Sequence, residues 1–276
     1  MTNRFFFFDM DGTLISPIRK RMLQSTVDSI RMLQKQGDHV FICSGRSYQM
    51  AMEYSDQLDI PGVIFCNGAG IAWEGEILDQ HPMKEEVIEE LIHFCSRTMS
   101  GYQLLGFRRT YQNFVGRAFM HIAFPRNGSS ISDEQKKRRA TMVPMKKYTN
   151  ETIYKMDVFN LNRRLAKKFF ENVPEGLQIF TTHGRYMFNA EIMMSGITKA
   201  RGVQKVLKMY GGKTEDAWCF GDSVNDIEMM KMCGHAVAMG NASKDVKAIA
   251  EYVTDDANHD GIRNALLHYG MIEGKQ

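Results

Sequence analysis

The segment RFFFFDMDGT, residues 4–13, decides the fold of this 276-residue chain. Its apolar part, Phe5–Phe8, does not alternate with polar residues, which is typical of a strand buried on both faces of a parallel sheet. Asp9 and Asp11 follow directly after this strand, and Gly12 permits a tight turn there. Carboxylates at the end of such a strand lie in the crevice where open α/β sheets bind ligands. The segment therefore predicts a central strand that ends at a functional site.

The residues on either side predict alternating strands and helices. Buried-strand runs at His39–Cys43 and Gly62–Cys66 are separated from the first strand, and from each other, by helical stretches. We expect Ser25 or Thr26 to cap the first of these helices, which ends near Gln36. The pattern returns late in the chain, with strands at 217–220 and 236–239 and helices at 196–210, 223–232, 243–251 and 261–269. This order predicts a doubly wound, Rossmann-like α/β core with a parallel sheet.

The middle of the chain has a different pattern. We expect strands at 102–107, 118–124, 152–159, 177–181 and 186–190, helices at 84–98 and 163–171, and a polar loop at 126–150. Strand runs separated by few helices indicate an α+β insert with a mostly antiparallel sheet. The predicted organisation is a core of residues 1–82 and 189–276 with an inserted α/β cap domain of residues 83–188.

Composition excludes several classes of protein. Hydrophobic residues make up 43% of the chain and charged residues 24%, the balance of a globular protein, and the net charge of +3 does not favour nucleic acid as a partner. No stretch offers the ~20 apolar residues that a membrane span requires. The five cysteines form no CxxC pair and are odd in number, which indicates free thiols in a reducing compartment. We therefore expect a cytoplasmic protein that binds neither nucleic acid nor membranes.

A second acidic motif, GDSVND at residues 221–226, follows a late strand. If that strand lies beside the first, Asp222 joins Asp9 and Asp11. Buried carboxylates repel one another unless a cation lies between them, and Mg²⁺ accepts such hard oxygen ligands. The alternative is structural, with Asp222 or Ser223 capping the helix that follows.

Two further residues lie where an anion could bind. Ser44 ends the second strand, and Gly45 after it leaves backbone N–H groups open at a helix start. Lys199 begins a helix, against the helix dipole, which indicates a neighbouring anionic group. Each residue taken alone is better explained as an ordinary turn or a solvated lysine.

Together these motifs resemble the haloacid dehalogenase-like phosphatases. The resemblance rests on DMDGT at 9–13, Ser44, Lys199 and the GDxxND pattern at 221–226. About 30 residues separate Asp11 from Ser44, too few for a cap domain there. An insert between Asn67 and Lys199, with the runs AMGNA at 238–242 and DGI at 260–262, resembles the Cof-type subfamily (subclass IIB) with its α/β cap.

The resemblance implies a role for each motif residue. Asp9 would be the nucleophile, and Asp11 the general acid and base. Mg²⁺ would be held by Asp9, the backbone carbonyl of Asp11 and Asp222. Ser44, Gly45, Lys199 and Asn225 would hold the phosphoryl group. Asp226 and Thr13 would orient the residues that contact the metal or the phosphoryl group.

The implied function is a Mg²⁺-dependent phosphatase of small phosphorylated metabolites that acts through an aspartyl-phosphate, with sugar phosphates as the best candidates. The cap would exclude water and select the substrate. One alternative is a phosphosugar mutase on the same scaffold; another is a binding or regulatory protein that retains the fold. The basic residues 136–139 and 146–147 could steer anionic substrates, contact nucleic acid or belong to a solvated loop. No feature of the sequence predicts the substrate itself, the cap residues that select it or the oligomeric state.

Overall fold

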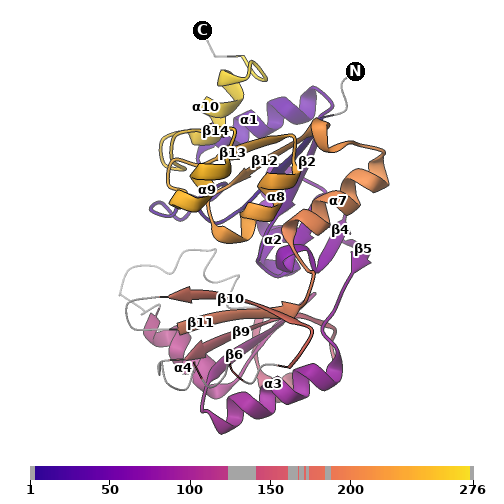
Figure 1. Ribbon diagram of the computed structural model, residues 1–276, viewed down its shortest axis with the longest axis vertical. Coiled ribbons are helices and arrows are strands. Elements are labelled where there is room, and N and C mark those ends of the chain that lie inside the picture. Colours follow the sequence, from indigo (N-terminus) through magenta and orange to yellow (C-terminus); the bar gives the residue numbers. More distant parts are fainter. Residues whose placement is uncertain are drawn as a thin grey trace. The chain divides into compact units, whose positions relative to one another are not determined.

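The computed structural model describes residues 4–123, 141–160, 174–183 and 188–273, together with Lys167 and Glu171. The chain forms two compact units (Figure 1). The first unit contains Met1–Arg46, Ala51–Gln80 and Thr198–Gln276, and the second contains Ser47–Met50 and His81–Ile197. The second unit ends at Ile197, whereas the sequence predicted its end at residue 188. Strand β11 (Phe188–Met194) belongs to the second unit because it pairs with two strands there.

The first unit contains an eight-stranded sheet with the order β14-β13-β12-β1-β2-β3-β4-β5. Six strands run parallel: β1 (Phe5–Phe8), β2 (His39–Cys43), β3 (Gly62–Phe65), β12 (Ala217–Gly221), β13 (His235–Ala238) and β14 (Tyr252–Val253). An antiparallel hairpin of β4 (Gly70–Trp73) and β5 (Glu76–Gln80), which the sequence reasoning missed, extends one edge. The predicted α/β fold with a parallel-sheet core is confirmed.

Strand β1 is the central strand that its sequence predicts. It lies between β12 and β2, and all four phenylalanines are fully buried. Phe5 and Phe7 join a core cluster to which helices α7 (Lys199–Tyr210) and α8 (Ile227–Met232) contribute, while Phe6 and Phe8 point to the opposite face. The chain leaves β1 toward β2 on one side and returns through β12 on the other. The carboxyl end of β1 is therefore the switch point of the sheet.

Six helices flank this sheet: α1 (Gln24–Lys35), α2 (Tyr48–Leu58), α7 (Lys199–Tyr210), α8 (Ile227–Met232), α9 (Lys244–Ile249) and α10 (Gly261–His268). Helix α7 begins after Thr198, whose hydroxyl accepts a hydrogen bond from the backbone N–H of Arg201 (3.2 Å), and it ends at Gly211. Helix α1 begins after Leu23 without a side-chain cap, so the predicted cap at Ser25 or Thr26 is wrong. The Ser25 hydroxyl donates to Asp260 instead.

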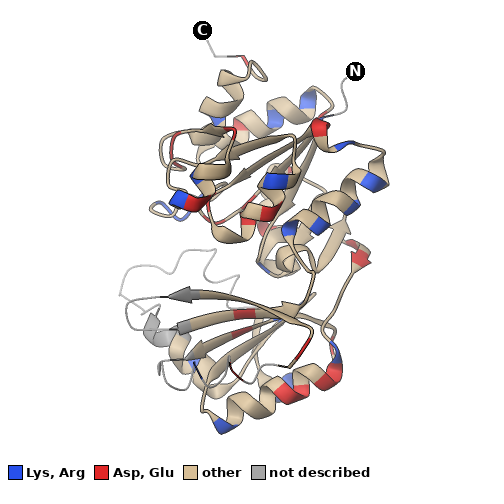
Figure 2. Ribbon diagram, viewed as in Figure 1, with Lys and Arg blue, Asp and Glu red and all other residues tan. Residues whose placement is uncertain are grey.

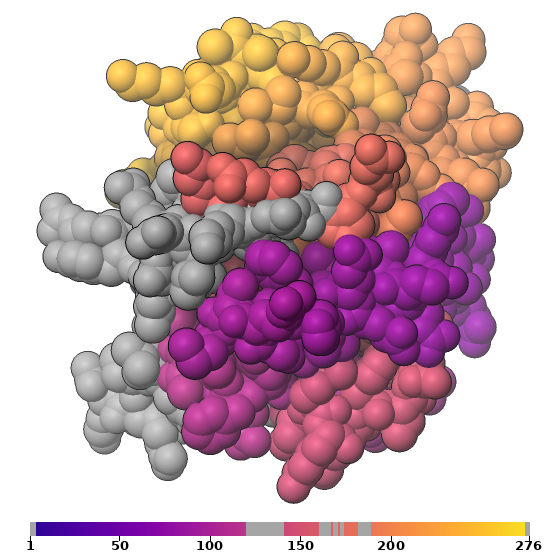
Figure 3. All heavy atoms as spheres, turned by 60° about the horizontal axis from the view of Figure 1, so that its bottom comes forward, coloured from indigo at the N-terminus to yellow at the C-terminus, as the bar shows by residue number. Residues whose placement is uncertain are grey.

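The second unit contains a six-stranded sheet with the order β10-β11-β9-β6-β7-β8. Its strands are β6 (Gly101–Gly106), β7 (Thr110–Gln112), β8 (Met142–Pro144), β9 (Ile153–Asn160), β10 (Leu177–His183) and β11, antiparallel except for the β7–β8 pair. Helix α3 (Glu85–Arg97) covers one face with Ile88, Leu91 and Cys95. Its outer side, which starts with the acidic pair Glu85 and Glu86, faces solvent (Figures 2 and 3).

The predicted strand at 118–124 is wrong, because helix α4 (Phe114–Ala123) occupies that part of the chain. The signal for this helix is Asn113, whose side-chain oxygen accepts hydrogen bonds from the backbone N–H groups of Gly116 (2.7 Å) and Tyr102 (3.0 Å). An N-cap of this kind starts a helix even when the residues that follow favour a strand.

Some expectations fall where the structure gives no description. Only Lys167 and Glu171 of the predicted helix at 163–171 are among the described residues. The basic residues 136–139 lie entirely outside them. The predicted loop at 126–150 contains strand β8 in its described part. Among the residues that are described, no helix is long and apolar enough to cross a bilayer.

Candidate active site

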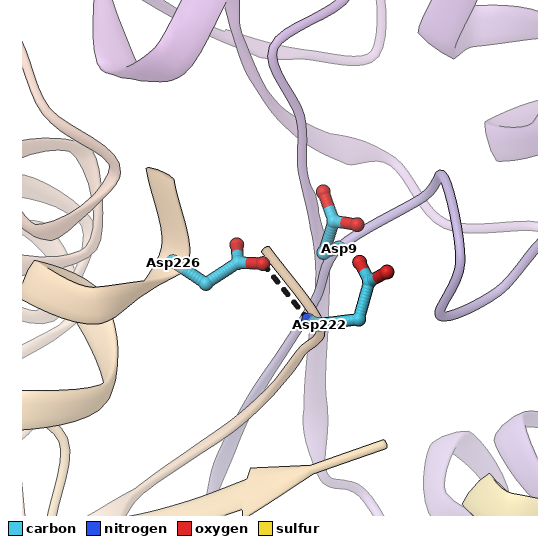
Figure 4. Close-up of side chains that lie close together, drawn as sticks. All are labelled: Asp9, Asp222 and Asp226. Carbon is cyan, nitrogen blue, oxygen red and sulfur yellow. Dashed lines mark hydrogen bonds between the residues drawn. The ribbon is translucent and has the colours of Figure 1, made fainter. Parts of the chain in front are cut away.

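The carboxyl ends of β1 and β12 bring the two acidic motifs together. These strands pair in parallel with Phe8 opposite Phe220, and the backbone N–H of Asp9 donates to the Phe220 carbonyl (3.0 Å). Carboxylate oxygens of Asp9, Asp222 and Asp226 lie within 4.8 Å of one another (Figure 4). The two strands are thus neighbours, which is the condition that the sequence reasoning set for Asp222 to join Asp9.

Lys199 supplies the positive charge of this cluster. It is fully buried at the start of α7, and its Nζ lies 2.5 Å from Oδ1 of Asp9 and 2.6 Å from Oδ1 of Asp226. Burial alone would lower the pKa of Lys199, but the carboxylates of Asp226 and Asp9 outweigh burial and hold its pKa above the usual value. Two carboxylates are thus the anionic neighbours that its position against the helix dipole predicted.

Asp226 holds Lys199 in place. One carboxylate oxygen, Oδ1, receives the lysine, and Oδ2 accepts hydrogen bonds from the backbone N–H groups of Asp222 and Ser223, both at 3.0 Å. The dashed line in Figure 4 marks the bond from Asp222. Because both oxygens are engaged, Asp226 is better placed to orient Lys199 and the β12 turn than to bind a metal.

Asp222, in contrast, has a carboxylate oxygen to offer. Its Oδ1 is buried and has no hydrogen-bond partner among the residues that the structure describes, while Oδ2 accepts from the Asn241 amide (3.2 Å). A buried oxygen without a donor is costly, and a cation would satisfy it. The approach of this carboxylate also requires Gly12, because a Cβ at that position would lie 2.2 Å from Oδ2 of Asp222.

Burial raises the pKa values of both carboxylates, an effect that a bound cation would oppose. Burial raises the pKa of Asp222 to about 7, and nearby Asp226 adds to this. Burial likewise raises the pKa of Asp9 well above its usual value, against the opposing attraction of Lys199. These hard oxygen donors, with one of them unpaired, fit Mg²⁺.

Asp11 lies apart from this cluster. Its side chain is 62% exposed and forms a bidentate ion pair with Arg46, with Nε at 2.7 Å from Oδ2 and Nη2 at 2.5 Å from Oδ1. The sequence reasoning did not single out Arg46, although it follows Ser44 and Gly45 directly at the end of β2. Arg46 therefore links the predicted site residue Asp11 to the end of β2.

Apart from Lys199, the predicted phosphate-binding residues lie around the end of β2. This strand pairs with β1 so that Ile42 is opposite Phe8, which places Ser44 near the level of the acidic cluster. Ser44 is buried, and a Cβ on Gly45 would lie 2.9 Å from the Asn67 side chain. The Asn225 amide donates to Asn67 (2.9 Å), a link that the sequence reasoning missed.

Two other residues support the acidic turns. Thr13 is buried in the first turn, where its backbone N–H donates to the Met10 carbonyl (3.4 Å), while its hydroxyl has no hydrogen-bond partner among the described residues. Asn241 was not predicted as a site residue, but it belongs to the AMGNA run that carried the subfamily resemblance. Its amide joins the two acidic turns by donating to the Gly12 carbonyl (2.8 Å) and to Asp222.

Comparisons with known proteins agree with this site. The profile of the haloacid dehalogenase-like hydrolase family matches residues 6–266. The putative phosphatase YkrA of Bacillus subtilis is 27% identical over 273 residues, which cover 99% of this chain and 100% of YkrA. The pyridoxal phosphate phosphatase YbhA of Escherichia coli is 26% identical, over 95% of this chain and 97% of YbhA.

Solved structures give the same result. A protein of Geobacillus kaustophilus superposes with a TM-score of 0.83 at 26% identity, over 98% of this chain and 100% of that one. The subclass IIB sugar phosphatase BT4131 superposes with a TM-score of 0.78 at 26% identity, again over 98% of this chain and 100% of that one. The resemblance drawn from the motifs, and with it the assignment to a phosphatase class of enzyme, is confirmed. The chain belongs to the haloacid dehalogenase-like hydrolases.

Proposed function

We propose that this protein is a Mg²⁺-dependent phosphatase that hydrolyses small phosphorylated metabolites through a phosphorylated Asp9. The observation that carries the proposal is the buried pair of Asp9 and Lys199 (2.5 Å) beside the unpartnered oxygen of Asp222. A protein that only binds its ligand does not require a nucleophile, such as the Asp9 carboxylate that Lys199 contacts here. The names of the relatives support sugar phosphates as the first substrates to test, and pyridoxal phosphate as the next.

The reaction has two displacement steps. In the first, an Asp9 oxygen attacks phosphorus, the ester P–O bond breaks, and Asp11 gives its proton to the leaving alcohol oxygen. In the second, Asp11 takes a proton from water, the water oxygen attacks the same phosphorus, and the bond to Asp9 breaks. Inorganic phosphate leaves, and both aspartates return to their starting states.

Other residues of the chain bind and orient the phosphoryl group. Lys199, the Ser44 hydroxyl and the backbone N–H of Gly45 would hold its oxygens, with Asn225 at the edge of the same site. Asp226 would keep Lys199 directed at Asp9, since it receives the lysine at 2.6 Å. Thr13 and Asn241 would fix the two acidic turns.

Asp9, the backbone carbonyl of Asp11 and Asp222 would hold Mg²⁺. When bound, the ion neutralises part of the phosphoryl charge, so that an anionic carboxylate can approach an anionic phosphate. In the proposed arrangement the second unit is the cap that excludes water and selects the substrate. The cytoplasm is the proposed location, because all five cysteines are buried and free, as in reducing compartments.

Mg²⁺ should stabilise the protein more at pH 8 than at pH 6. Because the pKa of Asp222 in the folded state is about 7, above its value in the unfolded chain, the metal-free protein loses stability as pH rises from about 4 to 7. The ion needs ionised carboxylates, so its stabilising effect grows over the same range. Thermal unfolding with and without Mg²⁺ at both pH values tests this, and the Asp222→Asn variant should lose most of the effect. A Mg²⁺ shift that is equal at both pH values, or that the variant retains, would contradict the proposed metal site.

Arg46→Ala should impair alkyl phosphates more than p-nitrophenyl phosphate. The pair keeps the Asp11 side chain in one orientation, and a protonated Asp11 would retain one of the two hydrogen bonds from Arg46 while its O–H faces the leaving group. An alkoxide needs the Asp11 proton far more than a nitrophenolate does. We expect kcat/KM to fall by about 10²-fold for an alkyl ester and by much less for the aryl ester.

Arg4→Ala is the matched control for this variant. Arg4 forms a bidentate pair of the same kind with Asp38 (2.7 and 2.6 Å), a residue with no role in the proposed site. An equal fall of kcat/KM for both esters in Arg46→Ala would mean that Arg46 acts in some other way than by positioning Asp11.

Phosphate release from a panel of phosphorylated sugars, nucleotides and cofactors, with and without Mg²⁺, tests the function itself. Mg²⁺-dependent release is expected. An isomerised phosphosugar in place of inorganic phosphate would identify a mutase, and no turnover of any compound would favour a binding protein.

A further inference from the structure

A short turn after strand β3 lies against the residues at the end of β2. This turn, Cys66–Gly68, follows β3 directly, and β3 pairs in parallel with β2, so the two strands end side by side. The backbone N–H of Asn67 donates to the Ser44 carbonyl (2.9 Å), and that of Cys66 donates to the Arg46 carbonyl (2.8 Å). The turn is thus hydrogen-bonded to the segment that contains Ser44.

The turn is also held by the start of helix α7. Gly68 has a φ of +92°, and a Cβ at this position would lie 2.1 Å from the Thr198 carbonyl oxygen, so only glycine fits. The Gly68 carbonyl accepts a hydrogen bond from Nη1 of Arg201 (3.0 Å). Lys199 lies between these two contacts in the sequence. The backbone of the turn is therefore fixed by contacts that do not involve the Asn67 side chain.

The side chain of Asn67 contacts a residue that follows a distant strand. It is 1% exposed, and its Oδ1 accepts a hydrogen bond from Nδ2 of Asn225 (2.9 Å). Asn225 follows β12, and the sheet order places β1 and β2 between β12 and β3. Gly45 is close to this bond, because a Cβ there would lie 2.9 Å from Oδ1 of Asn67 and 3.5 Å from Nδ2 of Asn225. The hydrogen bond therefore connects the two sides of the site at the ends of β1 and β2.

Two hydrogen bonds fix the orientation of the Asn225 amide. Its Oδ1 accepts from the Ser223 hydroxyl (2.6 Å), and its Nδ2 donates to Asn67. Nδ2 carries two N–H groups, and Asn67 is its one acceptor in the part of the chain that the structure describes. The other N–H can therefore donate to a phosphoryl oxygen. Without Asn67, only the Ser223 hydroxyl would hold the amide, which rotates over a broad range of angles when it is free.

We propose that Asn67 is a positioning residue of the phosphoryl site, which holds the Asn225 amide so that one N–H is available to the bound phosphoryl group. This inference rests on the proposed phosphatase function and adds a residue to it. Because Asn67 acts on the phosphoryl group through Asn225, its contribution does not depend on the leaving alcohol. It differs in this respect from Arg46, which pairs with the proposed general acid Asp11.

Asn67→Gly removes the side chain and keeps the backbone of the turn. Asn67 has a φ of 55° and a ψ of 34°, a left-handed conformation that glycine adopts without strain. We expect kcat/KM to fall about tenfold, the value of one hydrogen bond, and to fall equally for p-nitrophenyl phosphate and for an alkyl phosphate. Asn150→Gly is the matched control, since Asn150 also has a φ of 55° and is exposed in the second unit. It should leave kcat/KM unchanged.

A double-mutant cycle with Asn225→Ala shows whether Asn67 acts through Asn225. Asn225→Ala should lower kcat/KM by at least as much as Asn67→Gly does. The double variant should then have the same kcat/KM as Asn225→Ala, because the amide that Asn67 holds is already gone. A purely structural role of Asn67 would instead give losses that multiply in the double variant.

Binding of inorganic phosphate gives a second readout, which does not require turnover. In calorimetry with Mg²⁺, Asn67→Gly should weaken phosphate binding about tenfold relative to the wild type, and the double variant should bind phosphate no more weakly than Asn225→Ala. Asn150→Gly should bind phosphate as the wild type does.

Three results would overturn the inference. They are an unchanged phosphate affinity in Asn67→Gly, losses that multiply in the double variant, and a loss of kcat/KM for only one of the two esters. A wild type that releases no phosphate from any ester would instead contradict the phosphatase function. The cycle of phosphate affinities would then still decide whether Asn67 positions Asn225, and a protein that binds no phosphate would overturn the inference as well.

Discussion

Lys199→Met is expected to lower the free energy of unfolding by about 3–5 kcal/mol at pH 7 in metal-free buffer. The substitution keeps the length and volume of the side chain but removes the only charge within hydrogen-bond distance of both Asp9 and Asp226 in the described structure. Both carboxylates are buried, so they would be left without a counter-ion. The same variant should lose activity, because it also removes a proposed phosphoryl ligand.

The loss should depend on pH in a defined direction. Without the lysine, burial raises the pKa of Asp9 still further above its value in the unfolded chain. The folded variant then binds more protons than the unfolded chain at mildly acidic pH, and its stability falls as pH rises. Denaturant unfolding at pH 5 and pH 7 should therefore show the larger loss at pH 7.

Lys205→Met is the matched control on the same helix. Lys205 is 42% exposed, and its Nζ lies 3.2 Å from Asp79, so its loss should cost less than about 1 kcal/mol. A loss of similar size in both variants, or one that does not change with pH, would show that the buried cluster does not depend on the charge of Lys199.

Asp9→Asn is expected to reduce phosphate release by at least about 10³-fold while leaving the fold intact. The amide has the size of the carboxylate but cannot act as the nucleophile. Because burial raises the pKa of Asp9 well above its usual value, the charged form is unfavourable there. The variant should therefore unfold at the same temperature as the wild type or at a higher one, in the absence of Mg²⁺.

The control for this variant is Asp38→Asn, which makes the same change in a buried aspartate paired with Arg4. Turnover by Asp38→Asn should stay near that of the wild type. Release by Asp9→Asn within tenfold of the wild type would rule out Asp9 as the nucleophile. A strongly lowered unfolding temperature would show that the carboxylate has a structural role instead.

The strands and the residues at their ends could be predicted from the sequence because parallel strands align their carboxyl ends. The Phe5–Phe8 run predicts a buried strand, and once β12 pairs with β1, Asp9 and Asp222 have to be neighbours. Lys199 was predictable for a different reason. Its place at the start of a helix indicated a neighbouring anion only when taken together with the acidic motifs, and the structure places two carboxylates beside it.

Residues that act through long-range side-chain contacts could not be found in the same way. Arg46, Asn67 and Asn241 reach Asp11, Asn225 and Asp222 only after the chain has folded, and no periodicity or spacing marks these pairs. The strand expected at 118–124 was wrong because Asn113 caps a helix there, a signal that lies one residue before the helix and outside the apolar run.

The six-stranded sheet of the second unit illustrates the same limit. Strands β9, β10 and β11 have apolar patterns long enough to predict, whereas β7 and β8 are three residues each and owe their pairing to the strands beside them. The placement of Gln103, Asp157 and Glu191 side by side could not be predicted at all, because it depends on the register between the strands that carry them.

The stereochemistry at phosphorus tests the central claim most directly. A substrate whose phosphoryl group is chiral through oxygen isotopes, turned over with Mg²⁺ in the presence of a simple alcohol as acceptor, gives a product ester of measurable configuration. Two in-line displacements through Asp9 predict net retention. Net inversion would mean a single direct displacement, and it would contradict a phosphorylated Asp9.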